Sequence, residues 1–179
     1  MTADANSSVA ERARQVRLLI LDVDGVLTDG GLQFDNRGEE YKTFNSLDGH
    51  GIRMLLDSTI EVAVITGRQS QIVNHRMLDL GVKHIYQGCR DKLSAFTELL
   101  QTTGLEPGQA AYVGDDLPDL PILQRVGFAI AVNNAHAFVK QHCDWVTALP
   151  GGKGAVREIS DFILASQSLL EARQKQYLR

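Results

Sequence analysis

The sequence predicts an α/β fold, in which a Rossmann-like and mainly parallel sheet carries helices on both of its faces. The first observation is an alternation of short apolar runs with longer amphipathic segments, which is typical of parallel sheets covered on both sides. The second is that the chain of 179 residues is 44% apolar and 22% charged, the composition of a globular domain. The third is that polar residues follow several apolar runs directly, where parallel sheets place their chemistry.

The apolar runs are expected to form the strands of the sheet. They cover residues 18–21, 62–65, 84–86, 110–113, 128–132 and 145–146. Helices are expected over residues 51–56, 71–80, 92–102, 117–125, 135–142 and 155–170, and a solvated helix over residues 8–17. Residues 92–102 illustrate the pattern, because Leu93, Phe96 and Leu100 recur at the spacing of one helix face.

A small β-hairpin is predicted after the first strand, at residues 31–44, where a helix would otherwise follow. Its two arms flank Asn36-Arg37-Gly38, a typical turn sequence. No shift in composition marks a linker, so residues 1–179 are expected to form one domain with a flexible, charged tail at residues 171–179. The glycine-rich segment 151–154 has two interpretations: a flexible loop, or a place where the backbone approaches a ligand closely.

Charge and cysteine content narrow the class of protein. The net charge of −4 and the pI near 5.7 argue against a general nucleic-acid binder or a protein of anionic membranes. No apolar run approaches the roughly 18 residues of a membrane span, and residues 1–17 lack the apolar middle of a signal peptide. Cys89 and Cys143 stand in no metal-binding spacing and are interpreted as reduced thiols. We therefore expect a cytoplasmic protein that binds neither nucleic acid nor membranes.

Acidic residues follow two of the predicted strands. Asp22 and Asp24 come directly after residues 18–21, and Asp115 and Asp116 end the run that starts at residue 110. Carboxylates that converge on one point repel each other strongly unless a cation joins them. Oxygen ligands select a hard cation, so the pattern predicts a Mg²⁺ site.

A hydroxyl and an ammonium group are expected at the same edge. Thr66 follows the second strand of the sheet, and Lys92 begins the helix after the third. A lysine neutralises the charge of a phosphoryl group, and a hydroxyl donates a hydrogen bond to it. Taken alone, Thr66 is interpreted nearly as well as a helix cap as it is as a phosphate ligand. Taken alone, Lys92 is interpreted by default as a solvated helix residue.

This set of residues resembles the haloacid dehalogenase superfamily over nearly the whole chain. Its four motifs occur in order, as Asp22-Val23-Asp24-Gly25-Val26, Thr66, Lys92, and Gly114-Asp115-Asp116 with Asp119. The resemblance implies that Asp22 is the nucleophile that forms an aspartyl phosphate, and that Asp24 protonates the leaving group and then activates water. It further implies that Asp22, Asp115 and the backbone carbonyl of Asp24 hold Mg²⁺. Asp116 and Asp119 would support the metal and the lysine from behind.

The spacing of the motifs leaves no room for a cap domain. The 43 residues between Asp22 and Thr66 are used by the hairpin and one helix, and the 25 between Thr66 and Lys92 by one helix and one strand. A capless enzyme either acts on macromolecules or borrows walls from a neighbouring subunit. The exposed edges of the hairpin are available for pairing with another chain.

Three further segments resemble the capless 3-deoxy-D-manno-octulosonate 8-phosphate phosphatases. They are residues 28–30, 44–49 and 151–158. That family forms tetramers through a central barrel of hairpins and supplies a sugar for lipopolysaccharide in the cytoplasm. The resemblance implies substrate contacts at Asp24, Asn45, Ser46, Leu47, Asp48, Gly49, Arg53, Thr66, Gly67, Arg68, Arg76 and Lys92. Several arginines suit a substrate with both a carboxylate and a phosphate.

Three alternatives remain at this point. Phosphatases of nine-carbon, sialic-type sugar phosphates share the same motifs. A signalling receiver domain also combines an aspartate, a threonine and a lysine with Mg²⁺, but it lacks the second aspartate, Asp24. A non-catalytic oligomerisation domain would not need the intact acids.

Overall fold

The computed structural model describes residues 3–178, with side chains from Ser8 onward. Its main sheet is parallel, with the strand order β5-β4-β1-β6-β7-β8. This confirms the predicted mainly parallel α/β fold. The strands are β1 (Leu18–Leu21), β4 (Glu61–Ile65), β5 (His84–Tyr86), β6 (Ala110–Gly114), β7 (Phe128–Ala131) and β8 (Trp145–Val146).

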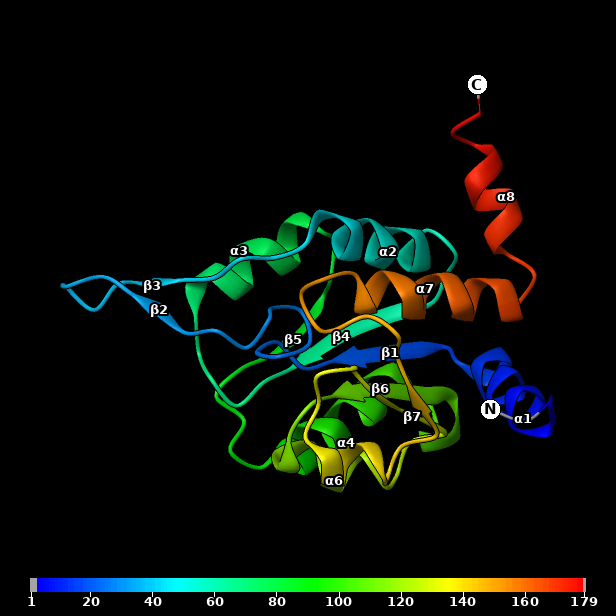
Figure 1. Ribbon diagram of the computed structural model, residues 1–179, viewed down its shortest axis with the longest axis horizontal. Helices are drawn as coiled ribbons and strands as arrows, with labels where there is room; N and C mark the ends of the chain where they lie inside the picture. The colour runs from blue at the N-terminus through cyan, green and yellow to red at the C-terminus, as the bar shows by residue number, and fades with distance from the viewer. Residues whose placement is uncertain (1–2, 179) are drawn as a thin grey trace.

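Helices cover both faces of the sheet. Figure 1 shows α2, α3 and α7 along one side and α4 along the other, where the short α5 packs between α4 and β6. The helices are α1 (Ala3–Gln15), α2 (Ser46–Leu56), α3 (Gln71–Asp79), α4 (Lys92–Thr103), α5 (Leu120–Leu123), α6 (Ala137–Lys140), α7 (Ala155–Ser166) and α8 (Leu170–Lys175). None of these described helices combines the length and the apolar character that crossing a bilayer requires.

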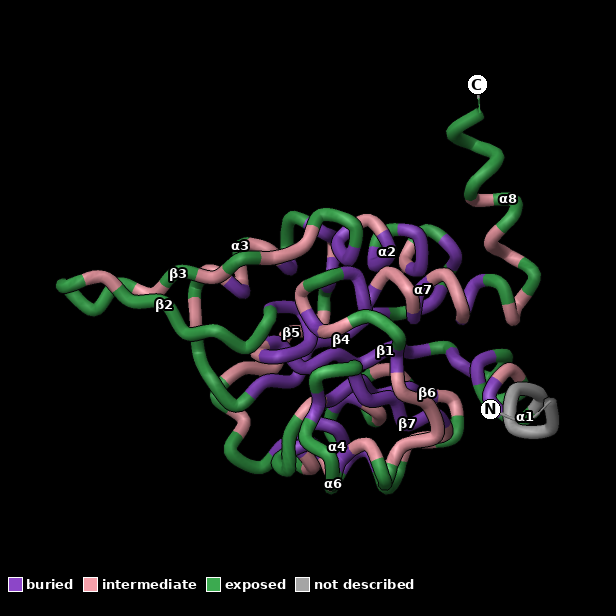
Figure 2. The backbone as a smooth tube through the Cα atoms, in the orientation of Figure 1, coloured by how far each residue is buried: buried purple, intermediate pink, exposed green. Residues whose placement is uncertain are grey.

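The central strands form the core because their residues are apolar on both faces. All four residues of β1 are fully buried, and β1 pairs with β4 on one side and β6 on the other. The buried segments in the middle of Figure 2 correspond to these strands and to the inner faces of the helices. A strand that is covered on both sides needs such a continuous apolar run. The carboxyl ends of β1, β4 and β6 therefore lie side by side at one rigid edge.

Polar caps determine where the helices begin. Helix α2 starts at Ser46, five residues before the predicted start at residue 51, because the Asn45 side chain accepts a hydrogen bond from the Leu47 N–H at 2.8 Å. In the same way Asp91 caps α4, directly before Lys92. The cap of α4 thus places Lys92 in the first turn, at the edge where the strands end.

The predicted hairpin is present and projects from the body of the molecule (Figure 1). Its strands, β2 (Gln33–Phe34) and β3 (Glu40–Tyr41), are shorter than predicted. The turn between them is held by Asp35, whose carboxylate accepts hydrogen bonds from the N–H groups of Arg37 and Glu39. Phe34 and Tyr41 are more than half exposed, at 55% and 54%.

The end of the chain differs from the predicted frayed tail. Residues 170–175 form α8, in which Lys175 pairs with Glu171 at 2.6 Å. The helix is exposed, but Arg173 donates hydrogen bonds to Ser58 Oγ and to the Asp57 carbonyl. These contacts explain why a charged segment is helical here; Arg179 lies outside the described residues.

The glycine-rich segment 151–154 is packed rather than loose. A Cβ atom on Gly151 would overlap the carbonyl oxygen of Gly25, and one on Gly152 would overlap the backbone of Thr28 and Asp29. The Gly152 N–H also donates to the Val26 carbonyl at 2.9 Å. The glycines therefore allow the loop before α7 to touch the loop after β1.

Candidate active site

The carboxyl ends of β1, β4 and β6 surround a hollow of about 260 Å³. The residues at its walls include Asp22, Asp24, Thr66, Gly67, Arg68, Lys92, Asp115 and Asp119. The structure thus brings together the motif residues that the sequence placed at separate strand ends. These side chains come from segments up to 97 positions apart, and the parallel sheet joins them.

Asp22 and Lys92 form a buried ion pair at the floor of this hollow. The Asp22 N–H donates to the Val113 carbonyl at 3.1 Å, which extends the pairing of β1 with β6, and Lys92 Nζ lies 3.0 Å from Asp22 Oδ1. Burial raises the pKa of Asp22 to about 6, against the opposing effect of Lys92. Burial lowers the pKa of Lys92, but the carboxylates of Asp22 and Asp119 outweigh it and the net pKa is raised. Lys92 therefore stays positively charged.

Asp119 connects the floor of the hollow to the backbone. Its Oδ1 accepts hydrogen bonds from Lys92 Nζ and the Tyr112 hydroxyl, both at 2.7 Å. Its Oδ2 accepts the N–H groups of Asp115 at 2.9 Å and Asp116 at 3.2 Å. With both oxygens engaged, Asp119 suits the predicted supporting role. Sequence reasoning missed Tyr112, because a tyrosine within an apolar strand does not reveal where its hydroxyl points.

Three carboxylate oxygens at the hollow are buried without a hydrogen-bond partner of good geometry. They are Asp22 Oδ1, Asp24 Oδ2 and Asp115 Oδ1, although Lys92 Nζ lies 3.0 Å from the first and Arg68 Nε lies 3.5 Å from the second. Carboxylate oxygens of Asp22, Asp115 and Asp119 also lie within 4.8 Å of one another. Unsatisfied buried oxygens are costly unless a cation joins them, and an all-oxygen set fits Mg²⁺. The predicted ligands therefore fit the predicted metal.

Gly25 explains how Asp115 comes so close to the loop after β1. Its φ of 95° lies in the left-handed region, and a Cβ atom there would overlap the Asp115 carboxylate. Burial, then the charges of Asp22 and Asp119, raise the pKa of Asp115 to about 7. The site is consequently a dense group of mutually repelling acids.

Asp24 has neighbours that sequence reasoning did not predict. Its Oδ1 accepts a hydrogen bond from Lys42, and Arg68 Nε lies 3.5 Å from its Oδ2. Glu40 accepts a hydrogen bond from Arg68 at 2.7 Å and lies 3.3 Å from Lys42. The alternation of polar and apolar residues from Glu40 to Thr43 indicated only an exposed strand. The contact between the base of the hairpin and the loop after β1 is not visible in that pattern.

Two further motif residues differ in their setting. Thr66 is buried, and its N–H donates to the Tyr86 carbonyl at 2.9 Å, so its position is fixed by the β4–β5 edge. Asp116 is exposed, and its side chain accepts the Leu117 N–H at 2.8 Å as the cap of a short 3₁₀ turn. Asp116 is also among the residues that wall the hollow, and of the two acids Asp119 contacts Lys92; a supporting role of Asp116 for the metal and the lysine stays a prediction.

Comparison with known proteins identifies the family. A family model for haloacid dehalogenase-like hydrolases matches residues 82–159. The 3-deoxy-D-manno-octulosonate 8-phosphate phosphatase KdsC of Escherichia coli K12 is 48% identical over 171 residues, which cover 96% of this chain and 91% of the relative. The chain belongs to the 3-deoxy-D-manno-octulosonate 8-phosphate phosphatase family.

Solved structures agree with this family assignment. The 3-deoxy-D-manno-octulosonate 8-phosphate phosphatase of Yersinia pestis superposes with a TM-score of 0.91 at 49% identity, covering 92% of this chain and 89% of that one. The enzyme of Moraxella catarrhalis, solved with magnesium, phosphate and KDO, superposes with a TM-score of 0.94 at 39% identity over 96% of this chain and 98% of that one.

A second group of expected substrate contacts lies apart from the carboxylates. Among the residues that wall the hollow, none comes from the Asn45–Gly49 segment, Arg53 or Arg76. Arg76 pairs with Asp79 at 3.2 Å and packs against Gly49, where a Cβ atom would overlap its guanidinium group. Arg53 donates to the Leu80 carbonyl at 3.2 Å. In this family member, one chain therefore presents these arginines on the α2–α3 surface, outside its own hollow.

Asp48 has a structural partner within the chain. It is buried, and its carboxylate accepts the N–H groups of Arg157 at 2.8 Å and Gly154 at 3.4 Å. Asp48 thus caps α7, and its role as a substrate contact stays a prediction. Asn45 donates to the Gly152 carbonyl at 3.4 Å and so joins α2 to the same loop. Leu47 is 58% exposed, and Ser46 begins α2.

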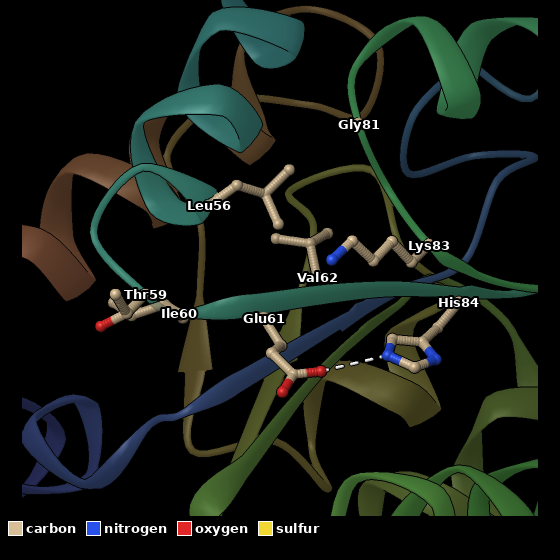
Figure 3. A pocket seen from close by; sticks show the side chains of 8 residues that line it. All are labelled: Leu56, Thr59, Ile60, Glu61, Val62, Gly81, Lys83 and His84. Atoms are coloured by element: carbon tan, nitrogen blue, oxygen red, sulfur yellow. Dashed lines mark hydrogen bonds and ion pairs between the residues drawn. The ribbon is translucent and has the colours of Figure 1, made fainter.

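A larger hollow, of about 400 Å³, lies at the opposite end of β4. Figure 3 shows that Glu61 and His84 meet on one side of β4, where their side chains are 3.1 Å apart, while Leu56 and Val62 lie on its other side. The lining of this larger hollow includes one carboxylate (Glu61), one ammonium group (Lys83) and one imidazole (His84). The smaller hollow at the other end of the sheet holds the groups that phosphoryl chemistry needs.

Proposed function

We propose that this chain hydrolyses 3-deoxy-D-manno-octulosonate 8-phosphate to the free sugar acid and phosphate, with Mg²⁺ as cofactor. The observation that carries this proposal is the meeting of buried Asp22, charged Lys92 and three unsatisfied carboxylate oxygens at one hollow. The identity of 48% with KdsC, and a relative solved with magnesium, phosphate and KDO, support the choice of substrate and metal. The reaction belongs to the cytoplasmic supply of a lipopolysaccharide sugar.

Asp22 is the proposed nucleophile. One of its carboxylate oxygens forms a bond to phosphorus while the bond from phosphorus to the sugar oxygen breaks, and Asp24 gives its proton to that departing oxygen. Asp24 then takes a proton from water. The water oxygen attacks phosphorus and releases Asp22 and inorganic phosphate. The two acids are two residues apart on one loop, and both wall the hollow.

Lys92 and Thr66 are the proposed phosphoryl ligands. The raised pKa of Lys92 keeps its ammonium group charged, so it neutralises a phosphoryl oxygen beside the nucleophile. When bound, Mg²⁺ offsets the charge of the carboxylates and the phosphate; Asp22, Asp115 and the carbonyl of Asp24 would hold it. Arg68 at the rim suits the anionic remainder of the substrate.

We further propose a homotetramer assembled through the hairpins. An isolated two-stranded hairpin is marginally stable in water, and this one exposes Leu32, Phe34 and Tyr41. Assembly would bury these side chains. Because Arg76 and Arg53 lie outside their own hollow, they are available to a neighbouring subunit's substrate. Light scattering in solution tests this: a tetramer supports it, and a monomer with full substrate selectivity contradicts it.

A phosphate-release assay tests the reaction. The purified protein is offered 3-deoxy-D-manno-octulosonate 8-phosphate, a nine-carbon sialic-type 9-phosphate and simple sugar phosphates, each with Mg²⁺ and with EDTA. The proposal expects the eight-carbon substrate to have the highest kcat/KM and all activity to stop in EDTA. Faster hydrolysis of the nine-carbon substrate would move the assignment to that sugar. Full activity in EDTA would contradict the metal assignment.

A further inference from the structure

Lys42 is a buried lysine on the segment that joins the hairpin to α2. Its side chain is only 2% exposed. Its ammonium group donates a hydrogen bond to Asp24 Oδ1 and lies 3.3 Å from Glu40 Oε1. Burying an ammonium group is costly unless carboxylates pair with it, so this position is held by its two partners. Lys42 belongs to neither a motif of the sequence analysis nor the walls of the hollow.

The contact with Lys42 distinguishes the two oxygens of Asp24. Oδ1 is occupied by Lys42, which is not among the residues that wall the hollow. Oδ2 accepts no hydrogen bond, and Asp24 is among the residues that wall the hollow. A carboxylate rotates freely about its terminal bond unless something holds one oxygen. Lys42 therefore holds the carboxylate of Asp24 in one orientation and leaves its second oxygen for the substrate.

Glu40 links Lys42 to Arg68, which is one of the residues that wall the hollow. Its Oε1 accepts a hydrogen bond from Arg68 at 2.7 Å and lies 3.3 Å from Lys42, and its side chain is 16% exposed. Burial alone would raise the pKa of Glu40, but its hydrogen bond with Arg68 and further partners lower it overall, so it stays ionised. The base of the hairpin thus holds both Asp24 and Arg68 within one subunit.

We propose that Lys42 is a positioning residue for proton transfer by Asp24, and that the hairpin is thereby part of the catalytic machinery of its own chain. The inference rests on the proposed function for the role of Asp24. Lys42 does not touch the substrate; it holds the acid that gives a proton to the departing oxygen. Misplacing a reacting group by about 1 Å can cost on the order of 10²-fold in rate.

The test compares two leaving groups in single turnovers with enzyme in excess. An alkoxide needs a proton to depart, whereas p-nitrophenolate leaves as a stable anion. In Lys42→Met, release of the sugar from the 8-phosphate, and of the alcohol from a simple alkyl phosphate, is expected to fall about 10- to 100-fold. Release of p-nitrophenol from its phosphate should stay within about threefold of wild type. Lys42→Arg, which keeps the charge, should recover part of the loss.

Two controls separate positioning from folding. Arg37→Ala changes an exposed cation at the hairpin tip, which pairs only with Asp35 among the described residues, and should leave both rates unchanged. Melting temperatures show whether each variant is folded. If Lys42→Met does not fold, Glu40→Gln is used instead, because it weakens the second contact of Lys42. This variant should slow release of the alcohol more than release of p-nitrophenol, by a smaller factor than Lys42→Met.

Equal losses for both leaving groups would overturn the proposal, because they would mean that Lys42 supports the whole site. No loss for either would overturn it too. A wild-type enzyme that is inactive on the sugar phosphate would refute the proposed substrate instead. The comparison of alkyl and p-nitrophenyl phosphate would still decide the role of Lys42.

Discussion

Replacing Asp115 by asparagine is expected to stabilise the metal-free enzyme at neutral pH, although Asp115 is a proposed Mg²⁺ ligand. Burial, followed by the charges of Asp22 and Asp119, raises the pKa of Asp115 from 3.8 to about 7. This is about a thousandfold in proton affinity, and each factor of ten corresponds to about 1.4 kcal/mol. Ionised Asp115 therefore lowers the free energy of unfolding by up to about 4 kcal/mol, and asparagine removes that cost.

The effect has a definite pH dependence. Because the pKa is higher in the folded protein than in the unfolded chain, the cost is absent below about pH 4, grows as the pH rises to about 7, and is constant above it. Thermal unfolding of wild type and Asp115→Asn in EDTA, at pH 5 and pH 8, measures this cost in stability. In a protein of this size each kcal/mol shifts the melting temperature by about 2–4 °C. Asp115→Asn should then melt on the order of 10 °C above wild type at pH 8 and only a few degrees above it at pH 5.

Mg²⁺ should reduce this difference in stability. At about a hundred times its Kd, the metal stabilises the wild type by about 2.7 kcal/mol, while Asp115→Asn should respond little. Asp116→Asn is the matched control, because it removes the adjacent charge from an exposed cap that asparagine can also form. The reasoning would be refuted if Asp115→Asn melted below wild type in EDTA at pH 8. It would also be refuted if Mg²⁺ stabilised the variant as much as it stabilises the wild type.

Three other outcomes are expected. Asp22→Asn should lose all turnover while keeping its fold by circular dichroism, because an amide cannot attack phosphorus; measurable steady turnover would contradict the nucleophile. Arg76→Ala should raise KM for the sugar phosphate and barely affect p-nitrophenyl phosphate, whereas Lys92→Ala should impair both, and equal effects of the two variants would contradict the borrowed arginine. Gly151→Ala should lower stability by at least about 1–3 kcal/mol in a denaturant titration, since its Cβ would overlap the Gly25 carbonyl; an unchanged midpoint would mean that the loop yields freely.

The sequence was informative wherever the chemistry is local. β1 is apolar at every position and ends at Asp22, so both the strand and the first acid could be predicted without knowing their neighbours. Thr66 and Asp115 follow their strands in the same way. A parallel sheet then brings these ends together by its topology alone, which is why the meeting of Asp22, Thr66 and Asp115 at one hollow could be predicted from order along the chain.

What the sequence did not reveal depends on long-range packing. Burial of the Lys42 side chain results from the contact of the hairpin base with Asp24, and nothing in the neighbouring residues distinguishes it from a solvated lysine. Tyr112 is hidden in the same way, since only the 3₁₀ turn beyond β6 brings Asp119 to its hydroxyl. The early start of α2 follows from the Asn45 cap, which apolar periodicity does not record.

The packing of Gly151 and Gly152 against the loop after β1 has a consequence for protein synthesis. The loop that carries Asp22 and Asp24 lies against a segment made about 130 positions later. On the ribosome, the strand and both acids emerge well before the surface that holds their loop in place. The packed form of this loop therefore has to wait until Gly151 and Gly152 have been made.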